Sequence, residues 1–239
     1  MQKVTKKSPD YFLNLIRQNK PFSLSRFGDG EVLCMFHNHM KTNCDGSRFL
    51  TELIYPMKQI FVNEHPYYHC LLNCSFDING DKFKAFIDET CPDMPFYDGE
   101  IWSELSFDGR MTELCQVLDK HSPVFVGGEH LLNTKYMYGF TDVSHIVTPS
   151  VDSFTAIDDI MGKIIEKYNE GSRMFLFSAG YTTKILIDSL YPIFGGDTFM
   201  IDMGSVFDPY CGVLSRDGHV SRGFDYFQAY TSLELGDVI

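Results

Sequence analysis

Apolar residues along the chain follow two spacings, and the two spacings alternate. Short continuous apolar runs, such as 124–126 and 174–177, end in glycine or serine. Between them lie longer stretches in which apolar residues recur every three or four positions, the period of an amphipathic helix. The runs predict strands at 22–27, 67–74, 123–128, 144–149, 173–180 and 197–204. The longer stretches predict helices at 8–20, 48–61, 82–90, 110–120, 152–171 and 182–191, and a further helix that opens at Asp29.

The ends of these helices carry recognisable signals. Ser8 and Pro9 suit the N-cap and the first position of a helix, and Pro21 disfavours helix in the residue before it. Pro56 predicts a kink or break inside the helix at 48–61. The helix at 152–171 has the clearest periodicity, and Gly171 suits its C-terminal cap.

Strands and helices in alternation are typical of a parallel sheet that is covered on both faces. We therefore predict an α/β, Rossmann-like fold with a mostly parallel sheet, in a single domain that spans residues 1–239. Residues 92–112, PDMPFYDGEIWSELSFDGRMT, break the alternation. We expect this segment to be an insertion or a lid.

Composition narrows the class of protein. Of the 239 residues, 44% are apolar, so a packed core is feasible. The formal net charge of −12 disfavours general binding to nucleic acid. We find no apolar run of membrane-spanning length, and the N-terminal ten residues are too short and too polar for a secretory signal. The seven cysteines have irregular spacing that suits free thiols rather than a zinc site, so we expect a cytoplasmic protein.

Three predicted strand ends carry polar residues, and ligands of open α/β sheets bind at the carboxyl ends of strands. One of them is SAGYTTK at 178–184, where a strand turns into a helix. Backbone N–H groups and the helix dipole favour a bound anion there, and the hydroxyls and Lys184 add donors. The same residues also suit an ordinary turn in which Ser178 or Thr182 caps the helix.

The second strand end is RFGDGE at 26–31. Asp29 and Glu31 form a D-x-E triplet whose hard oxygen ligands suit Mg²⁺ or Mn²⁺. Gly28 leaves room for close approach by a ligand, and Arg26 could pair with a phosphate. The pattern is short and common, and it also fits a helix start in which the acids cap the first turn. The third strand end, IDMGS, carries Asp202.

The segment FSLSRFGDGEV at 22–32 resembles the signature of the GT-D-fold glycosyltransferases. Three later segments resemble family segments in the same order: TPSVDSFTAIDDI at 148–160, FSAGYTTKILIDSLY at 177–191 and FMIDMGSVFD at 199–208. The resemblance implies that Asp29 and Glu31 hold Mn²⁺ or Mg²⁺, which bridges the diphosphate of a UDP-sugar. It implies further donor contacts from Arg26, Gly28, Asp152, Ser153, Phe154, Ser178, Gly180, Tyr181, Thr182 and Asp202. Members often have asparagine where Asp152 or Ser153 stands here.

The group that activates or orients the acceptor is harder to assign. Glu129 follows a predicted strand and is our candidate, although a helix-start glutamate would have the same position. Trp102 and Tyr97 could stack on an acceptor sugar.

The sequence favours a metal-dependent glycosyltransferase that moves a hexose or related sugar to a hydroxyl of a glycan, a glycoprotein or a modified base. The net charge argues against the last acceptor. A metal-dependent phosphohydrolase and a non-catalytic nucleotide-sugar-binding module remain alternatives, and the oligomeric state stays open.

Overall fold

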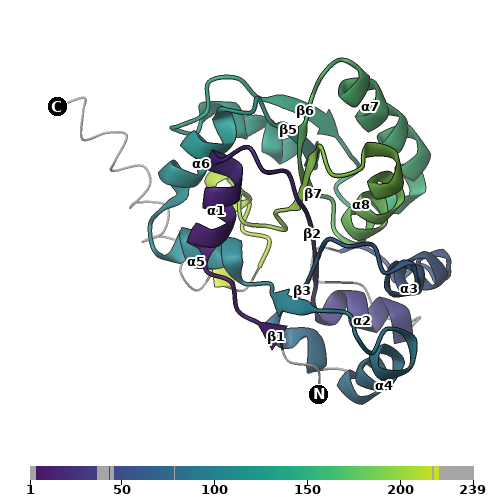
Figure 1. Cartoon of the computed structure of the whole chain (residues 1–239). Coiled ribbons are helices and arrows are strands. Elements are labelled where there is room, and N and C mark those ends of the chain that lie inside the picture. The colour runs from purple at the N-terminus through teal and green to yellow at the C-terminus, as the bar shows by residue number, and fades with distance from the viewer. Residues whose placement is uncertain (1–3, 37–42, 44–45, 78, 217, 221–239) are drawn as a thin grey trace.

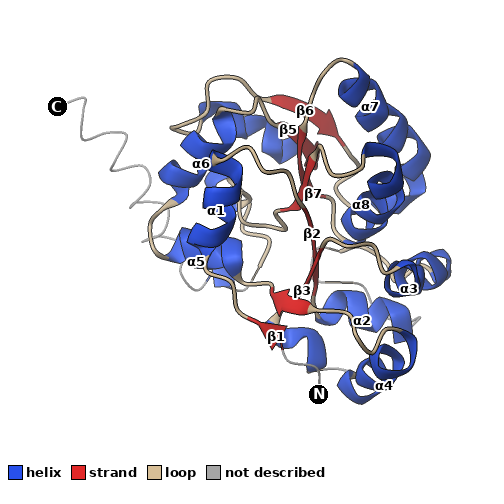
Figure 2. Cartoon of the chain, viewed as in Figure 1, coloured by secondary structure: helices blue, strands red, loops and turns tan. Residues whose placement is uncertain are grey.

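The computed structural model describes residues 4–36, 43, 46–77, 79–216 and 218–220. These residues form one eight-stranded sheet in the order β1-β4-β3-β2-β8-β7-β5-β6, and every neighbouring pair is parallel (Figure 1, Figure 2). The strands are β1 (Val4–Thr5), β2 (Ser23–Phe27), β3 (Tyr68–Leu71), β4 (Phe96–Asp98), β5 (Val124–Gly127), β6 (Ser144–Val147), β7 (Met174–Ser178) and β8 (Phe199–Asp202). The predicted α/β class with a parallel sheet is confirmed.

Helices cover both faces of the sheet, as predicted (Figure 2). One face carries α2 (Asp29–Phe36), α3 (Ile54–Asn63), α4 (Gly80–Thr90), α7 (Ile157–Asn169) and α8 (Tyr181–Phe194). The other face carries α1 (Pro9–Arg17), α5 (Ile101–Phe107) and α6 (Met111–Asp119). Short 3₁₀ helices connect these elements: η1 (Thr51–Leu53), η2 (Asn73–Phe76), η3 (Glu129–Tyr136), η4 (Ser153–Ala156) and η5 (Pro209–Cys211).

The sheet separates two hydrophobic cores. Along β7, Phe175 and Phe177 enter the core under α7 and α8, while Met174 and Leu176 enter the core under α1, α5 and α6. Successive side chains of a strand point to opposite faces, so a strand that is covered on both faces must be apolar at every position. This is why β7 appears in the sequence as a continuous apolar run.

The predicted helix ends are also found. The Tyr11 amide donates to Ser8 Oγ over 3.3 Å, and Pro9 is the first residue of α1. Gly171 follows α7 with a positive φ of 109°, which a glycine adopts without strain. The break expected near Pro56 lies just before it, because η1 ends at Leu53 and Pro56 occupies the first turn of α3. A missing N–H costs nothing there.

The prediction of an insertion or lid at residues 92–112 is wrong. Instead, this segment contains β4, which pairs with β3 and β1, and α5, which packs on the sheet. β4 is only three residues long, so its apolar pattern is too short to be recognised. None of the helices in the described ranges has the length and apolar character that a membrane span requires.

Candidate active site

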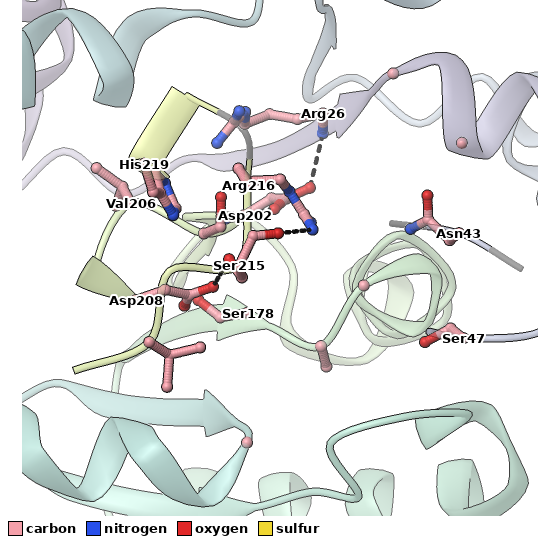
Figure 3. Close-up of a pocket in the computed structure, with 18 of the residues that line it drawn as sticks. Arg26, Asn43, Ser47, Ser178, Asp202, Val206, Asp208, Ser215, Arg216 and His219 are labelled. Atoms are coloured by element: carbon pink, nitrogen blue, oxygen red, sulfur yellow. Dashed lines mark hydrogen bonds between the residues drawn. The ribbon is translucent and has the colours of Figure 1, made fainter. Parts of the chain in front are cut away.

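A cleft of about 1110 Å³ opens at the carboxyl edge of the sheet. Its walls come from the residues that follow β2, β5, β7 and β8, together with residues of the C-terminal segment 204–216 and 218–219 (Figure 3). From β2 the chain continues to β3, toward one edge of the sheet. The strands β5 and β6 lie toward the other edge, beyond β8 and β7. Ligand sites of open α/β sheets lie where connections diverge in this way.

A buried cluster of three charges forms the floor beneath β2 and β8. The ammonium of Lys184, in the first turns of α8, lies 3.0 Å from Glu31 Oε1 and 3.1 Å from Asp202 Oδ2. The three side chains are 7%, 11% and 1% exposed, in the order Lys184, Glu31 and Asp202. A buried charge is tolerated only when it is paired and hydrogen-bonded, so these groups stabilise one another.

The pKa values reflect this pairing. Burial alone raises the pKa of Glu31, but the Lys184 ammonium and the Gly28 amide outweigh it and hold the pKa below its ordinary value. Burial alone lowers the pKa of Lys184, but Asp202 and Glu31 outweigh it and hold the pKa above its ordinary value. Glu31 and Lys184 therefore both stay charged at neutral pH.

Asp202 connects this cluster to the surrounding chain. Its Oδ2 accepts a hydrogen bond from the Arg26 amide over 3.0 Å, and its Oδ1 accepts one from the Gly204 amide over 2.9 Å. Its carbonyl accepts the indole N–H of Trp102 over 3.0 Å. Trp102 is fully buried, so the idea that it stacks on an acceptor sugar is wrong. Tyr97 is half-buried against the ring of Tyr68 and does not line the cleft.

Arg26 lines the cleft with a partly unsatisfied guanidinium. Its Nη1 donates to the Met203 carbonyl over 3.0 Å, while its buried Nε has no hydrogen-bond partner among the described residues. Gly204 makes room for the guanidinium, because a Cβ at that position would lie 2.7 Å from Nη1. A buried cation with an unused donor beside an open cleft is suited to an anionic ligand.

The two acids of the D-x-E triplet have different surroundings. Glu31 is fully engaged, with Oε1 on Lys184 and Oε2 accepting from the Gly28 amide over 2.8 Å. Asp29 lines the cleft, and its Oδ1 accepts the thiol of Cys74 over 3.5 Å. Among the described residues no cation pairs with Asp29. Of the two acids expected to hold a metal directly or through water, Asp29 has an available carboxylate and Glu31 has an engaged one.

The predicted phosphate turn lies where β7 meets α8. Ser178 and Gly180 line the cleft, and Gly180 has φ 56° and ψ −134°, a conformation open essentially to glycine. Ser178 Oγ is buried without a partner in the described part of the chain. The N-terminal end of α8 and this hydroxyl together offer donors to an anion.

Four predicted donor contacts do not reach the cleft wall. Asp152 is paired with Arg48, whose Nε lies 2.6 Å from Asp152 Oδ2. Phe154 packs against the hydrophobic core, and Tyr181 is buried beside Phe49.

Thr182 is buried as well, and it bonds Ser153 through the two hydroxyls over 2.8 Å. Ser153 itself lines the cleft, but its hydroxyl is engaged with Thr182 and the Ala179 carbonyl. These residues hold the loops around the cleft rather than lining it with free groups.

The wall formed by β5 and the C-terminal segment contains the predicted candidate Glu129, together with His130, Asp208 and Ser215, to which the sequence assigned no role. Glu129 is exposed at the start of η3 and lines the cleft, as does His130. His130 Nε2 lies 2.9 Å from Asp208 Oδ1, and Ser215 donates to Asp208 Oδ2. Figure 3 shows Asp208 and Ser215 pointing toward one another. His130 and Asp208 lie far apart in the sequence, so no local motif joins them.

A divalent cation fits this cleft only with help from a substrate. In the described ranges no three His, Cys, Asp or Glu side chains converge as a metal site. Magnesium-type sites commonly use one or two protein carboxylates and complete their coordination with substrate phosphates and water. The available carboxylate of Asp29, beside the donors that suit a phosphate, fits that kind of site.

The structure is that of an α/β protein with a cleft at the carboxyl edge of a parallel sheet, and donors of Arg26 and Ser178 that have no partner among the described residues lie at this cleft. No protein-family model matches the chain, and no curated protein matches it. Solved structures do. The structure of domain of unknown function 1792, described as a distinct glycosyltransferase fold, has a TM-score of 0.62 and 20% identity over 87% of this chain and 80% of its own. A glycosyltransferase with this domain from Streptococcus sanguinis has a TM-score of 0.65 and 17% identity over 87% and 84%. The chain therefore has a glycosyltransferase fold.

Proposed function

We propose that this protein is a metal-dependent glycosyltransferase that moves a hexose or related sugar from a UDP-sugar to a hydroxyl of a glycan or glycoprotein. One observation carries the proposal. At the carboxyl edge of a glycosyltransferase fold, the available carboxylate of Asp29 shares one cleft with the buried cation of Arg26 and its unused donor. A nucleoside diphosphate with a bound divalent cation needs both kinds of group.

In this proposal Asp29 binds Mn²⁺ or Mg²⁺ directly, and Glu31 contributes through water or by holding Lys184 in place. When bound, the cation supplies Lewis acidity that stabilises the charge developing on the departing diphosphate. Gly28 lines the cleft, and its lack of a side chain makes room for the side chains of Leu72 and Glu31. A Cβ at that position would lie 3.0 Å from Leu72 and 3.4 Å from Glu31 Oε2.

The remaining donors act on the same diphosphate. Arg26 would use its unpaired Nε to bind a phosphate oxygen, and Ser178 and Gly180 would bind another at the N-terminal end of α8. Asp202 keeps Arg26 and Lys184 in position through Oδ2, which accepts from the Arg26 amide and pairs with the Lys184 ammonium. Because these groups are held by the fold before a ligand binds, little reorganisation accompanies the reaction.

A donor screen tests the proposal. Thermal unfolding is measured with UDP-, GDP- and TDP-sugars, each with and without Mn²⁺, on the wild type and on Asp29→Asn. Binding at 100-fold excess over Kd adds about 2.7 kcal/mol, which raises the Tm of a chain of this size by about 5–11 °C. We expect such a shift for a UDP-sugar with Mn²⁺, and we expect Asp29→Asn to lose it.

Asp159→Asn is the matched control, because Asp159 lies on the surface of α7 in an exposed ion pair with Lys163. The same screen separates the alternatives. Phosphate release without an acceptor would indicate a phosphohydrolase, and binding without turnover or metal dependence would indicate a non-catalytic module. Equal shifts in the wild type and Asp29→Asn would remove the proposed role of Asp29.

A further inference from the structure

The cleft wall opposite the D-x-E motif contains an oriented histidine. His130 is the second residue of η3, a helix that begins two residues after the end of β5. Its side chain is 24% exposed, and it lines the cleft. Its Nε2 lies 2.9 Å from Oδ1 of Asp208, whose side chain is only 10% exposed. The other oxygen of Asp208 accepts the hydroxyl of Ser215. The carboxylate is thus fixed from two sides and holds the imidazole in one orientation.

This hydrogen bond fixes the tautomer of His130. An ionised carboxylate only accepts hydrogen bonds, so Nε2 carries the proton that is donated to Asp208. In the neutral ring Nδ1 is then the unprotonated nitrogen with a lone pair. A histidine whose far nitrogen is held by a carboxylate is the arrangement that makes a general base effective.

The glycine pair at the end of β5 lets the ring reach the cleft. A Cβ on Gly128 would lie 2.9 Å from His130 Nδ1, so a side chain at this position would displace the ring. The charged and titratable groups around this wall are Asp208, Glu129, Arg216 and His219. Arg216 donates to the Ser215 carbonyl over 3.0 Å, and His219 and Arg216 follow Asp208 on the same segment (Figure 3).

We propose that His130 is the general base for the acceptor and that Asp208 is its positioning residue. This inference rests on the proposed glycosyltransferase function and deepens it. Glu129 is the weaker candidate for the base. It is exposed, and in the described part of the chain no hydrogen-bond or ion-pair partner holds its carboxylate in one direction. His130 is held, and it lines the same cleft as Asp29 and Arg26 of the proposed donor site.

The acceptor oxygen forms a bond to the anomeric carbon of the donor sugar while the bond from that carbon to the diphosphate oxygen breaks. The electron pair of the broken bond leaves with the nucleoside diphosphate. The acceptor proton moves to His130 Nδ1, and the Asp208 carboxylate stabilises the imidazolium that forms. The imidazolium then releases its proton to solvent. Attack from the face opposite the leaving group inverts the anomeric configuration.

The test measures UDP release from UDP-glucose, UDP-galactose and UDP-N-acetylglucosamine in Mn²⁺, with water or a panel of para-nitrophenyl glycosides as acceptor. The variants are His130→Gln, which keeps a donor for Asp208 but has no base, and Asp208→Asn. Glu129→Gln tests the neighbouring carboxylate. His145→Gln is the control, because His145 bonds Thr134 and the Leu131 carbonyl away from the cleft.

We expect His130→Gln to reduce turnover about 100-fold or more while the donor-induced thermal shift stays unchanged. Asp208→Asn should fall between this variant and the wild type. The pH profile of the turnover rate should differ between the wild type and His130→Gln, because the variant lacks the proposed base. Added imidazole should restore part of the rate of His130→Ala, which a purely structural histidine would not allow.

Unchanged turnover in His130→Gln would overturn the inference, as would a larger loss in Glu129→Gln or a product with retained configuration. Each of these results leaves donor binding intact, so the glycosyltransferase proposal would survive. If the wild type binds no nucleotide sugar and releases no UDP, the proposed function fails and this inference fails with it.

Discussion

Removing the ammonium of Lys184 from the buried cluster is the most direct test of the site's construction. Lys184→Met keeps a side chain of similar length but leaves the carboxylates of Glu31 and Asp202 without their shared cation. The ammonium also donates to the Gly180 carbonyl over 3.2 Å, so the variant loses three contacts. The perturbation therefore affects both the turn before α8 and the D-x-E motif.

Breaking a buried ion pair by removing one partner costs about 3–5 kcal/mol, because an uncompensated charge stays buried. For a chain of this size that loss lowers Tm by about 6–20 °C. An exposed pair behaves differently. Lys163→Met removes the partner of Asp159 on the surface of α7, where both side chains are at least half exposed, and should cost less than about 1 kcal/mol.

The loss should also depend on pH. In the wild type, Glu31 has a lowered pKa and stabilises the fold above its ordinary value of 4.5, while Lys184 has a raised pKa and stabilises it below 10.5. Without the ammonium, burial dominates and raises the pKa of Glu31 in the folded state. The folded variant then binds more protons than the unfolded chain, so its stability falls as pH rises above 4.5.

Urea unfolding of the wild type, Lys184→Met and Lys163→Met at pH 5 and pH 7.5 measures both effects. The deficit of Lys184→Met should be smaller at pH 5 than at pH 7.5. A deficit below about 1 kcal/mol that is equal at both pH values would refute the buried cluster. It would indicate that solvent reaches these charges.

Three further predictions concern neighbouring features. Burial lowers the pKa of His69 from 6.5 to about 4. Between these pH values, the free energy of unfolding should fall by about 1.4 kcal/mol for each pH unit of acidification. Urea titrations of His69→Phe should show a weaker dependence of this free energy on pH. Gly204→Ala should displace the Arg26 guanidinium and weaken UDP binding in Mn²⁺ about tenfold, as measured by calorimetry, because its Cβ would lie 2.7 Å from Nη1. Burial and the Asp29 carboxylate raise the pKa of the Cys74 thiol. Iodoacetamide should therefore label Cys74 slowly near pH 7 in the wild type and faster in Asp29→Asn. Peptide mass spectrometry measures the two labelling rates.

Much of the fold follows from local spacing. β5 and β7 are apolar on both faces and end in glycine or serine, and α7 has a regular apolar stripe, so their types are readable from the chain. β1 and β4, with two and three residues, are different. A strand that short has no period of its own and exists because it pairs with a neighbour. The sequence therefore predicts the centre of the sheet and misses the edge at β1 and β4.

The site divides in the same way. Arg26, Ser178 and Asp202 could be placed together because they stand at the carboxyl ends of β2, β7 and β8, which are neighbours in the sheet. Their partners could not be predicted. Lys184 meets Glu31 only because α8 packs against β2, and His130 meets Asp208 only because η3 packs on η5. Which polar groups pair across the fold is decided by tertiary packing, and no sequence spacing encodes it.

The D-x-E triplet shows how one local rule could have refined the prediction. Both acids belong to α2, which begins at Asp29, and residues two apart in a helix point about 200° away from each other around its axis. Two carboxylates at this spacing leave the helix in different directions once the helix is formed. Both acids line the cleft, but Glu31 is held by Lys184, whereas no cation among the described residues pairs with Asp29. The motif therefore combines an acid available to a ligand with an acid that anchors the helix to the neighbouring elements, and substitutions at the two positions should separate binding from stability.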